Sequence, residues 1–136
     1  MACAMRSIRG ILSLILAAAS GAVLADWAKV ASDDDIYSAY ADKQSVHRQG
    51  DLVRMQGLYD FRRRDFTPDG KGLFSTVVLR EYDCNKRQVR LLSAIDFSGH
   101  MGTGTAVSTS DRPRRWEEIV AGGIDEIYFT LACSRD

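Results

Sequence analysis

Apolar and polar residues alternate along several stretches of the chain, which predicts a protein built mainly of β-strands. In the clearest stretch, residues 52–64, apolar side chains lie on one parity and polar ones on the other: Val53, Met55, Tyr59 and Phe61 against Arg54, Gln56, Asp60 and Arg62. A period of two with one polar side is typical of an antiparallel strand that buries one face. We therefore expect a strand over residues 52–64.

Two more strands follow, each after a turn-forming sequence. Residues 67–72, TPDGKG, predict a turn, and residues 73–84 predict the next strand. Its middle, residues 77–79, is apolar on both parities, which indicates a central strand with a cover on its second face as well. A tight turn at residues 85–86 leads to another alternating stretch, 89–97. Three strands joined by short turns predict a meander.

The segments before this meander are shorter and less regular. Residues 27–30 and 36–40 alternate on either side of a polar turn, Ser32–Asp35, and predict a hairpin. Residues 41–51 predict a helical turn or an irregular link that ends near Gly50. We therefore expect a hairpin and a link of about ten residues before the strand at residues 52–64.

The segments after the meander predict a strand, a loop and a helix. Residues 105–109 predict one more strand, and residues 110–118 predict a loop. Between residues 124 and 133, apolar side chains recur at helical spacing, and two acids occupy the first turn, where the helix dipole favours negative charge. The elements together predict an α+β fold: an antiparallel sheet of five or six strands with a C-terminal helix packed on one face, over the second face of the central strand.

Residues 1–25 have the three parts of a secretory signal peptide. Arg6 and Arg9 precede a short apolar run, 11–19, and small residues, Val23 and Ala25, stand at the third and first places before Asp26. The apolar run is shorter than a bilayer-spanning helix, so a retained membrane anchor is the weaker interpretation. We predict cleavage after Ala25, a single domain over residues 26–136, and a location in the periplasm, at the cell surface or outside the cell.

Removing the predicted signal peptide changes the charge balance. Of 136 residues 111 remain, and of 18 basic residues 16 remain against 18 acidic ones, which leaves a net charge of about −2. This balance gives no general attraction to nucleic acid or to anionic lipid. We expect no nucleic-acid partner and no stable membrane span after cleavage.

Two cysteines, Cys84 and Cys133, remain in the predicted mature chain. In an oxidising compartment an even number of cysteines favours a disulfide, and two cysteines allow one intramolecular pairing. Cys133 on the predicted helix could reach Cys84 at a strand end and join helix to sheet. Two free buried thiols remain the alternative.

Several sequence patterns are specific enough to compare with a known family. DWAKV opens the predicted mature chain, followed by Y-x-x-Y-A-D-x-x-S-V at Tyr37–Val46, and later by EYDCNKRQVRLLS, SGHMGTG, a tryptophan and a helix ending LAC. Over residues 26–133 the chain resembles the surface-adhesin protein E-like family of exported bacterial proteins. The resemblance implies a six-stranded antiparallel sheet backed by a helix, a Cys84–Cys133 disulfide, and an adhesin that binds host matrix or serum proteins. The chain differs from its relatives at His100, where proline is usual, and it lacks a lipidation cysteine after the predicted cleavage site.

Catalytic, metal and phosphate sites are weakly supported by the sequence. His47 and His100 are the only plausible bases, and neither belongs to a catalytic signature. The glycines of GHMGTGT lack the lysine and the helix of a phosphate loop. The acids of Ser32–Asp35 lack the spacing of a calcium loop, and the cysteines and histidines lack metal-ligand spacing. We expect no enzymatic activity, no cofactor and no metal.

Two basic segments are the candidate contacts for a partner. The first lies at the end of the predicted hairpin and contains Arg62, Arg63, Arg64 and Lys71; the second is the loop with Arg114, Arg115 and Trp116. Arginine and tryptophan are enriched at the centres of protein interfaces. We predict a binding module for a protein ligand, and a homodimer through edge strands is a further expectation. The alternative is a periplasmic structural or stress-protective protein with no host ligand.

Overall fold

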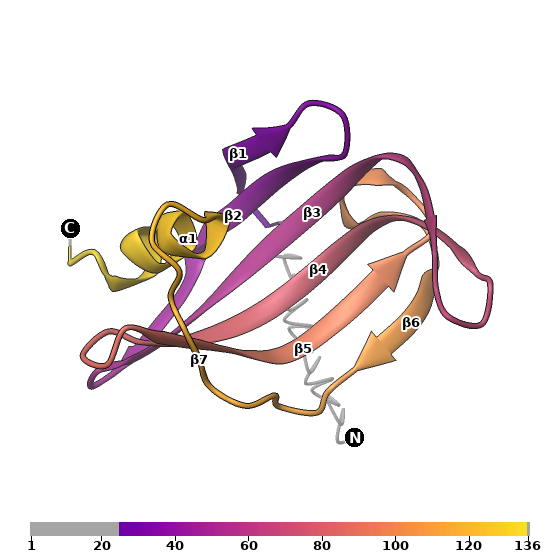
Figure 1. The fold of residues 1–136 in the computed structure, drawn as a ribbon. Helices are drawn as coiled ribbons and strands as arrows, with labels where there is room; N and C mark the ends of the chain where they lie inside the picture. The colour runs from indigo at the N-terminus through magenta and orange to yellow at the C-terminus, as the bar shows by residue number, and fades with distance from the viewer. Residues whose placement is uncertain (1–24, 136) are drawn as a thin grey trace, which may run out of the picture.

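The computed structural model describes residues 25–135, which form one antiparallel sheet with one helix on it (Figure 1). Six strands follow each other in spatial order as in the sequence, and a seventh pairs with β5. The elements are β1 (Trp27–Asp33), β2 (Tyr37–Gln49), β3 (Leu52–Phe66), β4 (Gly72–Asp83), β5 (Gln88–Phe97), η1 (His100–Gly102), β6 (Ala106–Ser110), β7 (Glu117–Glu118) and α1 (Ile124–Cys133). The predicted fold class is thereby confirmed. The predicted signal peptide lies outside the described residues apart from Ala25.

The prediction of a helical turn or link at residues 41–51 is wrong, because β2 continues to Gln49. The polar residues in this stretch form an irregularity inside the strand: Asp42 pairs with Gln56 and His47 with Arg54, so four residues of β2 oppose one of β3. The Ser45 hydroxyl accepts a hydrogen bond from the Gln56 amide at 2.8 Å. The bulge keeps the backbone partnered while breaking the alternation that would have identified a strand.

One face of the sheet packs against α1, which lies across β2 and β3 in Figure 1. Tyr128, Phe129 and Ala132 of the helix are buried, together with small and apolar strand residues: Ala39, Ala41, Val53, Met55, Tyr82 and Val89. Gly57 has no side chain at the contact, and a Cβ there would lie 3.2 Å from the Tyr128 ring. The Tyr128 hydroxyl donates to the Tyr40 carbonyl at 2.8 Å. Small strand residues thus let the helix approach the sheet closely.

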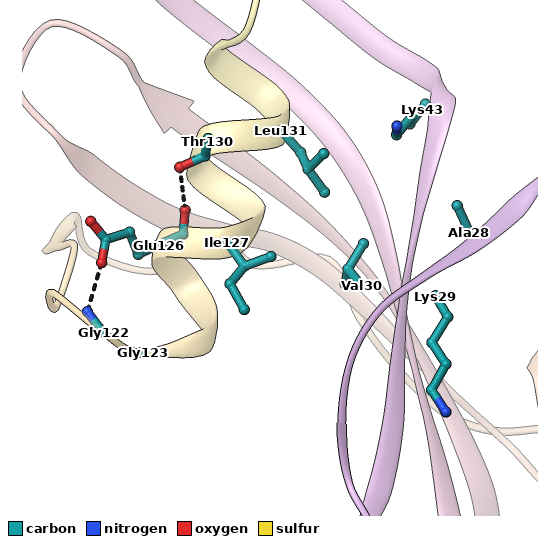
Figure 2. A pocket seen from close by; sticks show the side chains of 10 residues that line it. All are labelled: Ala28, Lys29, Val30, Lys43, Gly122, Gly123, Glu126, Ile127, Thr130 and Leu131. Atoms are coloured by element: carbon teal, nitrogen blue, oxygen red, sulfur yellow. Dashed lines mark hydrogen bonds between the residues drawn. The ribbon is translucent and has the colours of Figure 1, made fainter.

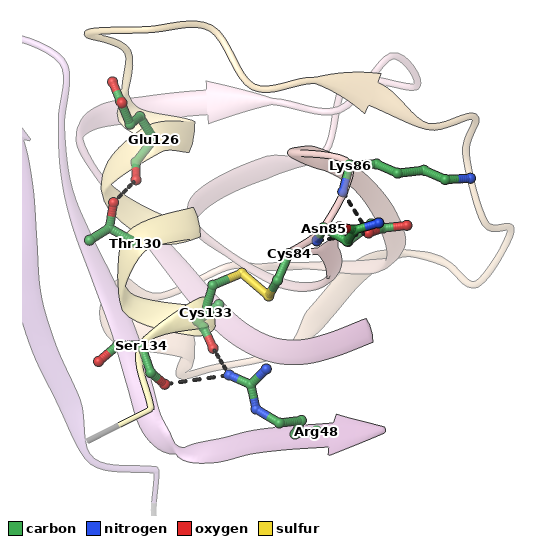
Figure 3. Close-up of a disulfide and its surroundings, with 10 residues drawn as sticks. Arg48, Cys84, Asn85, Lys86, Glu126, Thr130, Cys133 and Ser134 are labelled. Atoms are coloured by element: carbon green, nitrogen blue, oxygen red, sulfur yellow. Dashed lines mark hydrogen bonds between the residues drawn. A yellow bond between two sulfur atoms is a disulfide. The ribbon is translucent and has the colours of Figure 1, made fainter. Parts of the chain in front are cut away.

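The disulfide joins Cys84, just after β4, to Cys133, the last residue of α1 (Figure 3). The two Cα atoms are 5.7 Å apart. Beside it, the Arg48 guanidinium donates to the carbonyls of Ala132 and Ser134 at 3.4 Å each. The predicted pairing is confirmed, and the crosslink fixes the C-terminal end of the helix to the sheet.

The second face of the central strand is not covered by the helix, contrary to the prediction. Gly57 and Val78 face Tyr128, so their neighbours Leu58 and Val77 face the other side, where the segment around η1 covers them. A Cβ on Gly102 would lie 3.2 Å from a Val77 methyl group. Gly102 has a φ of 71°, a conformation that a side chain would strain, so glycine is favoured there by its conformation and by the tight contact.

Candidate functional site

The hairpin end of the sheet, formed by the end of β3 and the turn that follows, carries the first predicted contact cluster. Asp60 pairs with Ser75 and Asp65 with Leu73, so the four residues 61–64 oppose only Phe74. This bulge separates the arginines from the regular ladder, and Arg62, Arg63 and Arg64 are all exposed. Lys71, in the same turn, is exposed as well.

These basic side chains differ in the acidic or aromatic side chains that they contact. Arg62 lies 3.7 Å from Asp34, and Lys71 lies 3.5 Å from Asp69. The Arg64 guanidinium stacks over the Phe66 ring at 5.5 Å. Within the described residues, Arg63 has no carboxylate within 4.0 Å and no side-chain hydrogen bond. Arg63 is therefore the basic group of this end that is most available to a partner.

A cleft of about 490 Å³ lies beside these arginines and is lined by Ile36, Phe61, Arg63, Arg64, Asp35 and Asp65. Ile36 is 55% exposed and Phe66, next to the cleft in sequence, is 58% exposed. Large apolar side chains in water beside unpaired guanidinium groups have the composition of an interface centre. The sequence indicated the arginines here, but the exposure of Ile36 and Phe66 only became visible in the structure.

The second predicted cluster, Arg114 to Trp116, lies against β5. The Arg114 amide donates to the Leu91 carbonyl at 2.8 Å, and Arg114 and Arg115 are exposed. Trp116 is half-buried, with the Arg90 guanidinium 4.6 Å from its ring. Trp116 is therefore neither a free surface side chain nor part of the core under α1.

The structure does not bring the two predicted clusters together. The hairpin end is next to Leu73 of β4, whereas Trp116 precedes β7, which pairs with Val89 opposite Tyr82. Leu73 and Tyr82 are nine residues apart along β4, a distance of about 30 Å at roughly 3.3 Å per residue. The clusters are two separate surfaces.

A charge cluster around one buried carboxylate, beside Trp116, was not predicted. Arg54, Glu81 and Arg90 are paired across β3, β4 and β5. The Glu81 carboxylate, whose side chain is 4% exposed, accepts from Arg54 at 2.8 Å and from Arg90 at 2.6 Å. Burial raises the pKa of Glu81, but the hydrogen bonds and charges of the two arginines outweigh it, and the pKa lies below its ordinary value. The cluster holds three strands together on the face opposite α1.

An open groove of about 590 Å³ runs between β1 and α1 (Figure 2). Val30, Ile127 and Leu131 form its apolar part, and Ile127 is 41% exposed. Glu126, at its end, accepts from the Gly122 amide at 2.6 Å and lies 3.5 Å from Arg87. The groove joins residues about a hundred positions apart, so no local sequence signal could have shown it.

The glycine segment does not form an anion cradle. The Met101 amide donates to Asp60 at 2.7 Å, and the Gly102 amide donates to the Ser75 hydroxyl at 2.8 Å. Because these backbone donors are already used, the segment is a packed bend between β5 and β6.

His100 has a carboxylate partner, Asp60, but no hydroxyl partner among residues 25–135. His100 Nδ1 lies 3.2 Å from Asp60, and its ring lies 4.5 Å from the ring of Phe74. A hydrolytic site also needs a nucleophile bonded to the other ring nitrogen, and no such hydroxyl bonds His100 among residues 25–135. In the same range no group of three or more metal-ligating side chains forms, and no helix is long and apolar enough to cross a membrane.

Comparison with known proteins identifies the fold and the family. The selenomethionine form of Haemophilus influenzae protein E is similar in structure, with a TM-score of 0.63 and 11% identity over 80% of this chain and 86% of that one. Protein E from non-typeable Haemophilus influenzae has a TM-score of 0.55 and 12% identity over 78% and 81% of the two chains. No curated protein sequence matches the chain. The family described as surface-adhesin protein E matches residues 27–134. The chain belongs to the surface-adhesin protein E family.

Proposed function

We propose that this protein is a non-enzymatic envelope or cell-surface module that binds a protein partner through the hairpin end of its sheet. The observation that carries the proposal is the cleft lined by the exposed Ile36 and by Arg63, a guanidinium without a carboxylate partner. Next to it the exposed Phe66 ring packs against the Arg64 guanidinium. Membership of a surface-adhesin family supports an exposed, exported location and a host matrix or serum protein as the partner.

The chemistry of the hairpin end indicates the kind of partner. Both signs of charge line the cleft: Arg63 and Arg64 are basic, and Asp35 and Asp65 are acidic. Such a surface selects a partner with a complementary charge pattern more than one with a high net charge. Apolar contacts to Ile36 and Phe66 then supply most of the affinity. The loop with Arg114, Arg115 and Trp116 is a second, separate contact in this proposal.

Immobilised matrix and serum proteins test the proposal directly. We expect one or more to bind the oxidised protein, and the double variant Arg63→Gln/Phe66→Ala to bind at least about tenfold more weakly, as for loss of an interface centre. Arg112→Gln, exposed and outside both clusters, is the matched control. Equal binding of the double variant and the control would exclude the hairpin end as the contact.

Whole-cell accessibility tests the location. Cleavage by external protease, or labelling of intact cells, is expected for a surface protein. Protein found only in the periplasmic fraction and protected from protease would favour the structural or stress-protective alternative.

The predicted homodimer stays a prediction. The free sheet edges are those of β1 and β6. Edge β1 carries an exposed Lys29 and a register shift between Lys29 and Ala31, both of which oppose edge pairing. Light scattering of the oxidised protein gives the oligomeric state.

A further inference from the structure

One row of side chains crosses four strands on the face of the sheet opposite α1. His47 of β2 pairs with Arg54 of β3. Arg54 in turn pairs with Glu81 of β4, which pairs with Arg90 of β5. Directly opposite residues of antiparallel strands point to the same face of the sheet. Trp116, the residue before β7, continues the row, since its ring lies 4.6 Å from the Arg90 guanidinium carbon. At roughly 4.8 Å per strand, this transverse row is about 14 Å long from His47 to Arg90.

The transverse row presents positive charge to solvent. Glu81 is buried within it, whereas the side chains of Arg54 and Arg90 are 50% and 29% exposed. One carboxylate faces two guanidinium groups, so the three side chains together carry one positive charge. His47, beside Arg54, is exposed as well. An anionic group that approaches this face therefore meets the guanidinium groups before it meets the carboxylate.

The Arg54 guanidinium is held by one hydrogen bond and keeps its other donors available. Its Nε donates to Glu81 at 2.8 Å, and within residues 25–135 this guanidinium makes no other hydrogen bond. The two terminal nitrogens form a planar fork of N–H donors that matches the paired oxygens of a carboxylate or a sulfate group. Because Glu81 already fixes the side chain, less conformational entropy is lost when an anion binds.

The surroundings of the row on its hairpin side are neutral. Gln56, Leu79 and Ser93 pair with one another one level along the strands, and all three are half-buried. Their amide and hydroxyl groups can bond the hydroxyl groups of a sugar. Trp116 keeps part of its ring in water, and aromatic rings offer an electron-rich face to the C–H groups of a pyranose.

Acidic side chains bound the row on its other side. Asp83 and Gln88 pair one level toward the disulfide end, and Gln88 pairs with the exposed Glu118. The Asp83 carboxylate accepts from the amides of Asn85 and Lys86, at 3.1 and 2.9 Å. Glu118 is thus the acid of this level that opposes an anionic ligand, and it restricts such a ligand to the row and its neutral side.

We propose that the transverse row binds an acidic polysaccharide, with an anionic group on the Arg54 fork and a sugar ring against Trp116. Fixed cations in a line, an aromatic ring and neutral hydrogen-bonding groups match a chain that carries charge, pyranose rings and hydroxyl groups at intervals. The inference deepens the proposed function, because it rests on the exposed location proposed above and gives the Trp116 surface a glycan as its ligand.

Binding of the whole oxidised protein to immobilised polysaccharides tests the inference. The probes are heparin, which carries sulfate and carboxylate groups, hyaluronan, which carries carboxylates alone, and neutral dextran. Salt of about 0.15 M limits long-range attraction, since the Debye length is then about 8 Å. We expect saturable binding to heparin and none to dextran. Binding to hyaluronan as well assigns the contact to carboxylate, and binding to heparin alone assigns it to sulfate; both results support the proposal.

Variants separate the row from general attraction. Arg54→Gln is expected to weaken heparin binding about tenfold or more. Arg112→Gln removes the same charge from an exposed position outside the row and should leave the affinity unchanged. Trp116→Leu changes no charge and should weaken binding about threefold to tenfold. Arg54→Lys keeps the charge without the fork and should also bind more weakly, so the test stands even where circular dichroism shows Arg54→Gln unfolded. Glu118→Gln should tighten binding about twofold.

Three results would overturn the inference: no binding to either acidic polysaccharide, equal losses in Arg54→Gln and Arg112→Gln, or poly-glutamate binding as tightly as heparin. The last would assign the row to an acidic peptide. If polysaccharides fail to bind while matrix or serum proteins still bind in a manner sensitive to Arg63→Gln/Phe66→Ala, this inference fails and the proposed function stands.

Discussion

The two ends of this sheet are made from the same strands but use their side chains in opposite ways. At the disulfide end, Val53 and Tyr82 of the sheet are buried against Tyr128 of a helix that Cys133 links to Cys84. At the hairpin end, a phenylalanine and an isoleucine remain in water beside three exposed arginines. In Figure 1 α1 lies at the end of the sheet away from the β3–β4 hairpin.

The difference separates stability from recognition. Apolar burial and the crosslink are concentrated at the disulfide end, so side-chain changes there affect folding. The hairpin end contributes little buried apolar surface, so its side chains can change with small effects on folding. Four substitutions or conditions test this division, in order of decreasing effect.

Loss of the disulfide should have the largest effect. The bond joins residues 49 apart, and the chain-entropy relation gives about 4 kcal/mol for a loop of this size. We expect Cys84→Ser/Cys133→Ser to lose about that much of its free energy of unfolding in urea. Reduced wild-type protein is the matched control, and unchanged stability in both would show that the helix needs no crosslink.

Glu81→Gln should cost about 2–3 kcal/mol, because two arginines lose the buried carboxylate between them. The half exposure of Arg54 keeps the cost below that of a fully buried pair. Since the folded pKa of Glu81 is depressed, its contribution is present above its unfolded pKa and is lost as the pH falls through the folded one.

Urea denaturation between pH 3 and pH 7 measures this contribution. The variant should lose part of the acid dependence, whereas Glu118→Gln, at an exposed position, should keep it. An acid dependence identical in Glu81→Gln and wild type would refute the ion cluster as its source.

Alkaline pH should act through the buried tyrosines and not through the exposed hairpin side chains. Burial raises the pKa of both Tyr82 and Tyr128 well above the ordinary value of 10. A raised folded pKa means that stability is complete below pH 10 and declines above it, by about 1.4 kcal/mol for each buried tyrosine at pH 11. The Tyr128→Phe variant should lose less of its free energy of unfolding between pH 8 and pH 11 than wild type does, as measured by urea denaturation. An unchanged slope would place the ionising groups elsewhere.

Changes at the hairpin end should have the smallest effect on folding. Phe66→Ala and Arg63→Gln are each expected to change the free energy of unfolding by no more than about 0.5 kcal/mol, since both side chains are exposed. Thermal and urea unfolding of the two variants measure this. A loss of 2 kcal/mol or more would mean that this end helps to hold the fold and would undo the comparison.

The regular elements could be predicted because their signals are local. The alternation at residues 52–64 and the helical spacing at residues 124–133 correspond closely to β3 and α1. The error at residues 41–51 arose at a bulge, where the alternation is interrupted although the chain remains extended. The sequence showed which residues form the two contact clusters. It did not show that the clusters lie at opposite ends of the sheet.

By itself, the sequence determined the strand and helix periods, the single cysteine pairing available to an oxidised mature chain, and the basic composition of two segments. Only the tertiary structure decided that Glu81 lies between Arg54 and Arg90, and that the segment around Gly102 covers the second face of the sheet. The physical reason is register. Periodicity shows which face a side chain occupies, whereas the residue opposite it depends on bulges and turns that join segments far apart in the chain.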